Sequence, residues 1–300
     1  MLKKARINGR GQTEYSWIFS LIIGAVIIFF AIYFATKYVG TSTVQSSAEI
    51  ARNFDILLNP FASIGSITTL SLSKEVTMPA DMLLNFTCNA AGDYDNLAVK
   101  LDAKNADWFN YKISNKYIFS ENLHGRNYWV FSKSLYMPWR VDDMIYIVSD
   151  KYCFVGAPDS VMKEIRDMGD SQVSLNCSTG SKRVCFGIQN CDINVNYGQG
   201  TVRKNRETLT FSGDAMMYGA IFSDNSVYKC NIQRLMKRLA VQSDINIKIA
   251  DKLGFEGCQT TAVRKGLISL KSAAESNNLL NVRDFAKEVG NSNPAECPIF

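Results

Sequence analysis

Few residues of this chain have the types and spacing that catalysis requires. Asp142 and Asp143 could act as a general acid and base, but neighbouring residues of a strand point to opposite faces. His124 is the only histidine, and no nucleophile and carboxylate can be assigned to it as a triad. No glycine-rich loop lies between a strand and a helix, where it would hold a phosphate. We therefore assign no catalytic residue and no cofactor, and we predict that the protein is not an enzyme.

Eight cysteines form the second set of residues with chemical potential. An even number, all in the long part of the chain that follows the N-terminal apolar segment, is typical of disulfides in an oxidising compartment. The alternative is a metal site built from Cys177, Cys185 and Cys191, but the chain lacks the CxxC pairs that zinc sites usually use. We expect disulfides and no metal. The candidate residues are Cys88, Cys153, Cys177, Cys185, Cys191, Cys230, Cys258 and Cys297.

Residues 17–35 form an apolar stretch without a charge. As a helix they would rise about 28 Å at about 1.5 Å per residue, close to a hydrocarbon core of about 30 Å. Trp17 and Tyr33 suit the two membrane interfaces. The segment therefore predicts a transmembrane helix. A cleaved secretory signal is the alternative, but its apolar region would usually be shorter and end in small residues.

The charges around this stretch predict an orientation. Four basic residues precede it, whereas Lys37 is the only charge close behind it. By the positive-inside rule, the N-terminus is expected in the cytoplasm and the larger C-terminal part outside the cell. The basic residues are Lys3, Lys4, Arg6 and Arg10.

The junction before the apolar stretch reads Gly9-Arg10-Gly11-Gln12-Thr13-Glu14-Tyr15. It resembles the class III signal of archaeal type IV pilin-like proteins over about residues 1–50. The resemblance implies cleavage between Gly11 and Gln12 by a prepilin-type peptidase, which leaves the helix intact. It also implies that Glu14 pairs with the new N-terminal amine of a neighbouring subunit, although the acidic residue of such signals usually lies fifth after the cut and Glu14 is third. The alternative role for Glu14 is a hydrated carboxylate in the headgroup zone.

Later parts of the chain resemble a group of membrane-anchored archaeal proteins with the same N-terminal layout. The similar pieces read NKYIFSENL, KYCFVGAP, YGAIFS and KCNIQRLMKRL. This resemblance implies anchorage and an archaeal lineage, and no activity.

The apolar helix is expected to continue beyond residue 40. Residues 41–58 lack Gly and Pro, and their apolar residues recur at partly helical spacing. Asn59-Pro60 would end the helix, because proline pushes the preceding residue away from helical angles. One helix over 12–58 is the prediction.

Residues 62–222 predict a β-rich domain. Short segments with alternating, β-branched or aromatic residues are separated by polar breaks, which indicates antiparallel hairpins. One helix is expected near 159–168, and the apolar run at 215–222 is a buried strand or the start of a helix.

In residues 226–300 the apolar residues recur at helical rather than strand spacing. Helices are expected over about 226–253, 258–276 and 280–289. Antiparallel packing of the last two would bring Cys297 near Cys258, and this is the disulfide we favour.

Together these patterns predict an α+β fold. It has a long N-terminal transmembrane helix, an antiparallel β-rich ectodomain and a C-terminal helical hairpin or three-helix segment. The expected divisions are a basic leader at 1–11, the helix at 12–58, the β-rich ectodomain at 62–222 and a helical subdomain at 226–300.

Three surface features remain. Asn85 and Asn176 begin sequons for N-glycosylation, although the second sequon contains a cysteine. An aromatic group, which consists of Tyr128, Trp129, Tyr136 and Trp139, could bind a sugar or a partner, but such residues at strand spacing more often form a core. The basic run at 203–206 reads as a solvated turn.

A net charge of +5 does not indicate a nucleic-acid-binding protein. Taken with the pilin-like resemblance, the layout implies an extracellular structural or adhesive surface protein that self-associates through its N-terminal helix. Its expected partners are the lipid bilayer, itself or other pilin-like subunits, and a prepilin-type peptidase. The alternative is a binding ectodomain that does not polymerise, such as a receptor or an accessory subunit of a secretion or envelope complex.

Overall fold

The structure, a computed structural model, describes residues 12–63, 72–104, 106–169, 172–187 and 190–300. In the first of these segments it describes side chains for residues 21–34 and 47–59. The expected leader at 1–11 lies outside the described residues.

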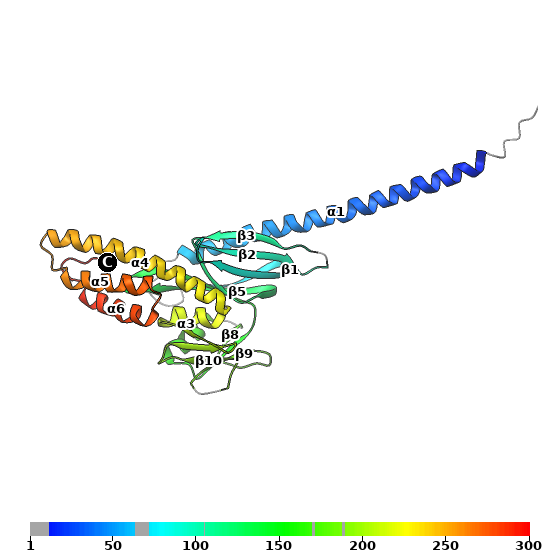
Figure 1. Ribbon diagram of the computed structural model, residues 1–300. Coiled ribbons are helices and arrows are strands. Elements are labelled where there is room, and N and C mark those ends of the chain that lie inside the picture. Colours follow the sequence, from blue (N-terminus) through cyan, green and yellow to red (C-terminus); the bar gives the residue numbers. More distant parts are fainter. Residues whose placement is uncertain (1–11, 64–71, 105, 170–171, 188–189) are drawn as a thin grey trace, which may run out of the picture.

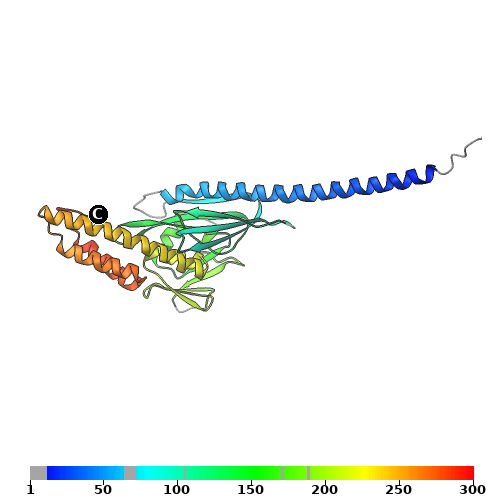
Figure 2. The same ribbon diagram turned by 45° about the horizontal axis from the view of Figure 1, so that its top comes forward.

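Helix α1 (Gln12–Ser63) is the longest element, with 52 residues. Its N-terminal part projects from the body of the molecule, and its C-terminal part lies along a sheet (Figures 1 and 2). The expected end at residue 58 is wrong, because α1 continues through Asn59-Pro60 to Ser63. Leu58 is buried against the sheet, and such tertiary packing usually contributes more to helix stability than local preferences do.

The expected membrane segment is not borne out. Among the residues that the structure describes, no helix offers an apolar stretch long enough to cross a membrane. Within 17–35, side chains are described from Leu21 to Phe34. The predicted transmembrane helix is therefore wrong, and so is the predicted single-pass localisation with a cytoplasmic N-terminus and an extracellular C-terminal domain.

The first sheet lies beneath the C-terminal part of α1 (Figure 1). Its strand order is β3-β2-β1-β5-β6-β4. All neighbouring strands are antiparallel except β4 and β6, which are parallel. The strands are β1 (Leu72–Asn89), β2 (Tyr94–Leu101), β3 (Phe109–Ser114), β4 (Tyr117–Ser120), β5 (Leu123–Tyr136) and β6 (Arg140–Val148).

Both faces of this sheet are covered. In β6, Ile145 and Ile147 belong to the core shared with α1, whereas Met144 and Tyr146 belong to a larger core on the other face. Successive residues of a strand point to opposite faces. The continuous burial of β6 therefore reflects two cores rather than one.

The second sheet has the order β12-β11-β10-β9-β7-β8. The pairs β7–β8, β7–β9 and β9–β10 are parallel, and the two remaining pairs are antiparallel. The strands are β7 (Tyr152–Val155), β8 (Val173–Ser174), β9 (Lys182–Phe186), β10 (Ile193–Asn196), β11 (Thr201–Lys204) and β12 (Glu207–Thr210).

The expected antiparallel β-rich domain is therefore wrong in its sheet type, since both sheets are mixed. Helix α2 (Asp159–Met168) lies between β7 and β8 in the chain, and a helix in that position allows the strands on either side to run parallel. Alternation along a strand reports which faces are buried, but it does not report the direction of the neighbouring strand.

Helices follow the second sheet in the chain. They are α3 (Gly213–Phe222), α4 (Asn225–Phe255), α5 (Thr261–Glu275) and α6 (Leu279–Ser292). The apolar run at 215–222 is the buried part of α3, and the three helices expected after residue 226 are confirmed as α4, α5 and α6. Helix α6 continues past its expected end at residue 289 to Ser292.

All eight cysteines form disulfides, as expected. The favoured bond between Cys258 and Cys297 is confirmed, with the two Cα atoms 6.2 Å apart. The sulfurs of the alternative metal site are bonded instead within disulfides. The other three bonds are Cys88–Cys230, Cys153–Cys177 and Cys185–Cys191.

Candidate functional site

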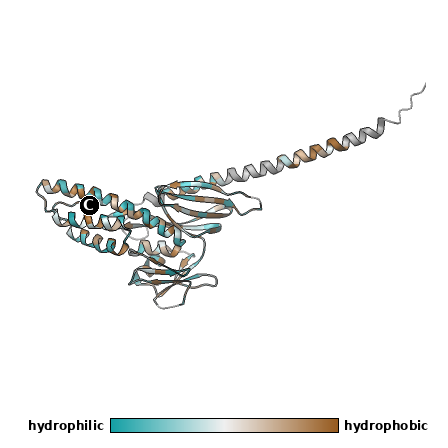
Figure 3. Cartoon of the chain, viewed as in Figure 1, coloured by the Kyte–Doolittle hydropathy of each residue, from teal (hydrophilic) through white to brown (hydrophobic). Residues whose placement is uncertain are grey.

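The projecting part of α1 carries the most unusual surface of the described chain. Between Leu21 and Phe34, large apolar side chains are exposed in nearly every position. Figure 3 shows this stretch as a hydrophobic segment that stands apart from the body of the molecule. A methyl group added at Gly24 would meet nothing within 4 Å, so no described part of the chain packs there. The exposed residues are Leu21, Ile22, Ile23, Val26, Ile27, Ile28, Phe29, Phe30, Ile32, Tyr33 and Phe34.

These side chains point in all directions around the helix axis. Successive residues of a helix are about 100° apart, so four in a row, such as 27–30, already surround the axis. A helix that packs on one surface needs only an apolar stripe, and one that is apolar all round is buried on every side. The stretch from Leu21 to Phe34 therefore has the composition of a helix enclosed by several neighbours.

The C-terminal part of α1 differs from the projecting part. Ala51, Phe54 and Leu58 are fully buried and lie on one face, at spacings of three and four residues. The ring of Phe54 packs against Phe86 of β1, with 6.2 Å between the ring centroids. A single stripe thus holds this part of α1 on the sheet.

One ion pair supports the same contact. The Lys116 ammonium lies 2.6 Å from the Asp55 carboxylate, and the Tyr111 hydroxyl donates to the same carboxylate at 3.2 Å. Lys116 is nearly buried, which reduces the screening of this pair by water. Burial raises the pKa of Tyr111, and the neighbouring Asp55 charge raises it further. The apolar stripe and this polar group together fix the direction in which α1 leaves the body.

A buried guanidinium fixes α4 to the first sheet. Arg234 donates to Asp93 at 3.0 Å, to Asp95 at 3.0 Å and to Asn231 at 2.8 Å. Its charge also lies 4.8 Å from the centre of the Tyr117 ring. Burial raises the pKa of Asp95 to about 6, and the Arg234 charge opposes that rise. Arg234 is only 2% exposed, although its spacing with Lys237 and Arg238 along α4 is typical of the solvated face of an amphipathic helix.

The Cys88–Cys230 disulfide reinforces this contact, because it joins β1 to the first turns of α4. The nearby Lys237 ammonium also donates to the backbone carbonyl of Ala90 at 2.9 Å. The C-terminal helices are thus held to the sheet that carries α1.

The structure describes little of the predicted processing and assembly residues. Gly11 lies outside the described residues, and Gln12 is the first residue of α1. Glu14 lies in the first turn of α1, but its side chain is not among those described. The roles of these three residues stay predictions.

The two sequon asparagines differ in exposure. Asn176 is exposed, and Cys177 within its sequon is bonded to Cys153. Asn85 lies half-buried in β1 and borders a cavity of about 400 Å³ beside Asp224 and Ser226. Use of either sequon stays a prediction.

The residues considered for catalysis do not meet. His124 pairs at 2.9 Å with Asp102 on an exposed surface. Asp142 pairs with Arg238 at 2.8 Å, whereas the buried Asp143 binds Arg140 and accepts from Ser134. His124, Asp142 and Asp143 are therefore each engaged by a different ion-pair partner.

The basic run forms a tight hairpin turn. Asn205 and Arg206 have φ values of 50° and 63°, and Lys204 pairs with Glu207 across the turn. This is the geometry of a two-residue type I′ hairpin. Lys204 turns inward and donates to the carbonyl of Ile221 at 3.1 Å, and burial lowers its pKa.

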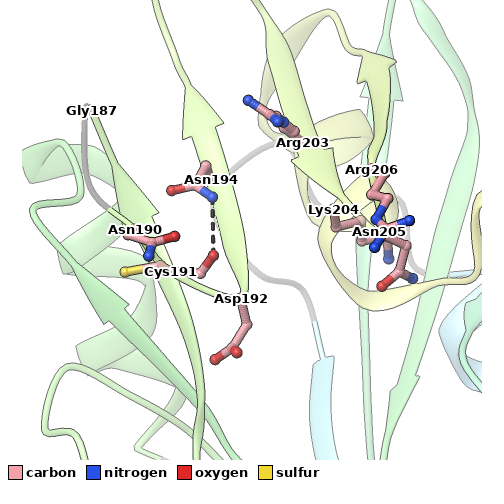
Figure 4. A pocket seen from close by; sticks show the side chains of 9 residues that line it. All are labelled: Gly187, Asn190, Cys191, Asp192, Asn194, Arg203, Lys204, Asn205 and Arg206. Atoms are coloured by element: carbon pink, nitrogen blue, oxygen red, sulfur yellow. Dashed lines mark hydrogen bonds between the residues drawn. The ribbon is translucent and has the colours of Figure 1, made fainter.

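A cavity of about 590 Å³ borders this hairpin. Figure 4 shows Arg203 and Arg206 on one side and the region of Asp192 and Asn194 on the other. Asn194 donates to the Cys191 carbonyl at 3.0 Å, and Asp192 accepts from the Arg183 amide at 2.8 Å. The cavity contains both signs of charge, so it lacks a clear preference for an anion or a cation.

Known proteins add no further constraint. No protein-family model, no curated protein and no solved structure matches this chain. The functional proposal therefore depends on the exposed apolar part of α1 and on the contacts that hold its other end.

Proposed function

We propose that this protein is an extracellular structural subunit that self-associates through the projecting part of α1, in the manner of a pilin. The single observation behind this proposal is the apolar surface from Leu21 to Phe34, which no other part of the described chain covers. Exposing apolar surface to water costs about 25 cal/mol of free energy for each square ångström. Covering it is therefore a strong driving force for association.

Further copies of the chain are the occupants that best suit this surface. One partner helix would cover one stripe, and the apolar residues continue all round the axis. A bundle of several α1 helices covers every side and presents the same sequence to each neighbour. The anchored end of α1 would place the folded bodies around the outside of this bundle.

The disulfides are consistent with an extracellular location. Bonds of this kind persist in oxidising compartments and are rare in the cytosol. All eight cysteines are paired. The proposal therefore assigns the folded body to such a compartment.

The proposed maturation step is cleavage between Gly11 and Gln12. Helix α1 begins at Gln12, so removal of the leader would leave the helix whole. In the bundle, Glu14 would pair with the N-terminal amine of a neighbour. Such a pair would offset the free-energy cost of removing the Glu14 carboxylate from water when the subunits associate.

The experiment compares the native chain with Ile27→Asp. Ile27 is 62% exposed, and its replacement places a charge inside the proposed bundle. The matched control is Val241→Asp, because Val241 is also 62% exposed but lies on α4. We expect the native chain and Val241→Asp to form large assemblies after detergent removal, and Ile27→Asp to remain monomeric. Light scattering after size-exclusion chromatography measures the mass, and negative-stain images show whether filaments form.

Two results would contradict the proposal. A native chain that stays monomeric would favour the alternative of a binding domain that does not polymerise. Equal assembly of the native chain and Ile27→Asp would place the contact elsewhere on the molecule.

A further inference from the structure

A third cavity lies away from α1. It has a volume of about 330 Å³ and forms where the end of β5, the start of α3 and the side of α6 meet. These three elements are distant in sequence, so the fold creates the cavity. The lining residues that could contact a polar ligand are Tyr136, Ser212, Gly213, Arg283, Lys287 and Asn291.

Two cations give this cavity a positive side. Arg283 and Lys287 are four residues apart on α6 and so occupy the same face of that helix. Lys287 pairs with no acidic group among the described residues. The Nε of Arg283 donates to the exposed Asp284 at 3.1 Å, which leaves its terminal N–H groups for another acceptor.

The start of α3 adds further donors. A helix leaves its first backbone amides without partners inside the helix, and they carry a partial positive charge. Asp214, in the first turn, is engaged elsewhere, since its carboxylate accepts from the Tyr197 hydroxyl at 2.8 Å. Its oxygen also lies 3.9 Å from the Lys133 ammonium.

Ser212 adds a hydroxyl to the same side of the cavity. It occupies the N-cap position of α3 but makes no capping hydrogen bond with its side chain. It is only 7% exposed, and its hydroxyl has no partner among the described residues. Ser212 lines the cavity and its hydroxyl oxygen is not enclosed by protein, so the hydroxyl can donate to a ligand there.

The remaining lining residues indicate what kind of anion fits. Tyr136 is 43% exposed, which is unusual for a large aromatic residue within a strand of this sheet. An exposed aromatic ring can cover the C–H face of a sugar. The Asn291 amide can both donate to and accept from hydroxyl groups. A bare inorganic anion would use the cations and the amides of α3 but not the ring.

We propose that this cavity binds a sugar residue that carries a carboxylate, as part of an acidic saccharide. Arg283 and Lys287 pair with the carboxylate, the hydroxyl of Ser212 and the amides of α3 donate to it, and Tyr136 covers the ring of the sugar. The volume is at the lower end for small-molecule pockets, which suits one sugar residue at a time. The proposal is independent of the self-association through α1.

The test measures binding to the full oxidised chain by isothermal titration calorimetry with three probes. Digalacturonate has the sugar and the carboxylate, α-1,4-galactobiose has the same sugar without the charge, and inorganic phosphate has the charge without the sugar. We expect digalacturonate to bind at least about tenfold more tightly than either of the others, which corresponds to about 1.4 kcal/mol.

Variants then locate the site. Lys287→Gln and Tyr136→Ala are each expected to weaken digalacturonate binding about tenfold. The control is Lys265→Gln, because Lys265 is an exposed lysine of α5 that does not line the cavity. It should bind as the native chain does. Circular dichroism and thermal unfolding verify that each variant is folded.

Three outcomes would overturn the proposal. If phosphate bound as tightly as digalacturonate, the cavity would recognise an anion and not a saccharide. Saturable binding that Lys287→Gln and Lys265→Gln weaken equally would place the site elsewhere. No saturable binding of any probe would show that the cavity is not a binding site for this class of ligand.

Discussion

At the scale of single residues, the buried carboxylate of Asp95 makes stability depend on pH. Its pKa is raised from 3.8 to about 6, because burial disfavours the charged form more than the Arg234 charge favours it. The folded chain therefore holds a proton that the unfolded chain releases at lower pH. The stability contributed by this proton is fully present below pH 3.8 and is lost as the pH rises through about 6.

The corresponding variant is Asp95→Asn, which keeps the shape of the protonated carboxyl group. Relative to this variant, the native chain should lose about 3 kcal/mol of unfolding free energy between pH 3.8 and pH 7. Urea denaturation of both proteins across this range measures the difference. Asp93→Asn removes an exposed carboxylate that also contacts Arg234, and it should retain the native pH dependence. Parallel pH profiles for the native chain and Asp95→Asn would contradict the assignment.

At the scale of elements, α1 is held on the sheet by one apolar stripe. Phe54 is 1% exposed and lies at the centre of this contact. Replacing a buried phenylalanine by alanine typically costs about 3–5 kcal/mol. We expect Phe54→Ala to lower the unfolding free energy by about that amount, whereas Ile56→Ala on the same helix, at a residue 53% exposed, should change it by less than about 0.5 kcal/mol.

Hydrogen exchange would separate local from global effects of Phe54→Ala. The strands of the first sheet share one core with α1 and another with α3 and α4. Loss of protection confined to α1 and the strand residues that face it would show that the α1 contact opens by itself. Equal loss on both faces of the sheet would show that the two cores unfold as one unit.

The elements also show how far sequence patterns reach. Helices α2, α4 and α5 have a repeat of 3.6 residues that is local, so their positions followed from the sequence to within a few residues. The parallel pairing of β4 with β6 depends on contacts between distant segments, and alternation along a strand carries no such information. The burial of Arg234 was missed for the same reason, because Asp93 and Asp95 are far away in sequence.

The two candidate sites also differ in how much of each could be recognised from the sequence. The apolar stretch from Leu21 to Phe34 was visible as composition, although its interpretation as a membrane span is wrong. The cavity beside Arg283 and Lys287 combines residues from three separate elements, and only Tyr136 among them stood out beforehand. A local pattern can report an unusual surface, but a site assembled by the fold requires the fold.

At the scale of the whole molecule, the disulfides constrain the chain to very different extents. The bond between Cys88 and Cys230 closes a loop with a sequence separation of 142 residues and joins the first sheet to α4. The bond between Cys185 and Cys191 spans a separation of only 6 residues within the second sheet. If the bonds act by restricting the unfolded chain, loop-closure entropy predicts about 5 kcal/mol for the first and about 2 kcal/mol for the second.

These two bonds provide a matched comparison. In one variant Cys88 and Cys230 both become serine, and in the other Cys185 and Cys191 do. Urea denaturation should show that the first variant loses about 3 kcal/mol more unfolding free energy than the second. The first variant should also show greater hydrogen exchange where α4 meets the first sheet, because Arg234 would then hold that contact without its covalent neighbour. Equal losses in the two variants would show that the bonds stabilise the folded state through local contacts rather than by restricting the unfolded chain.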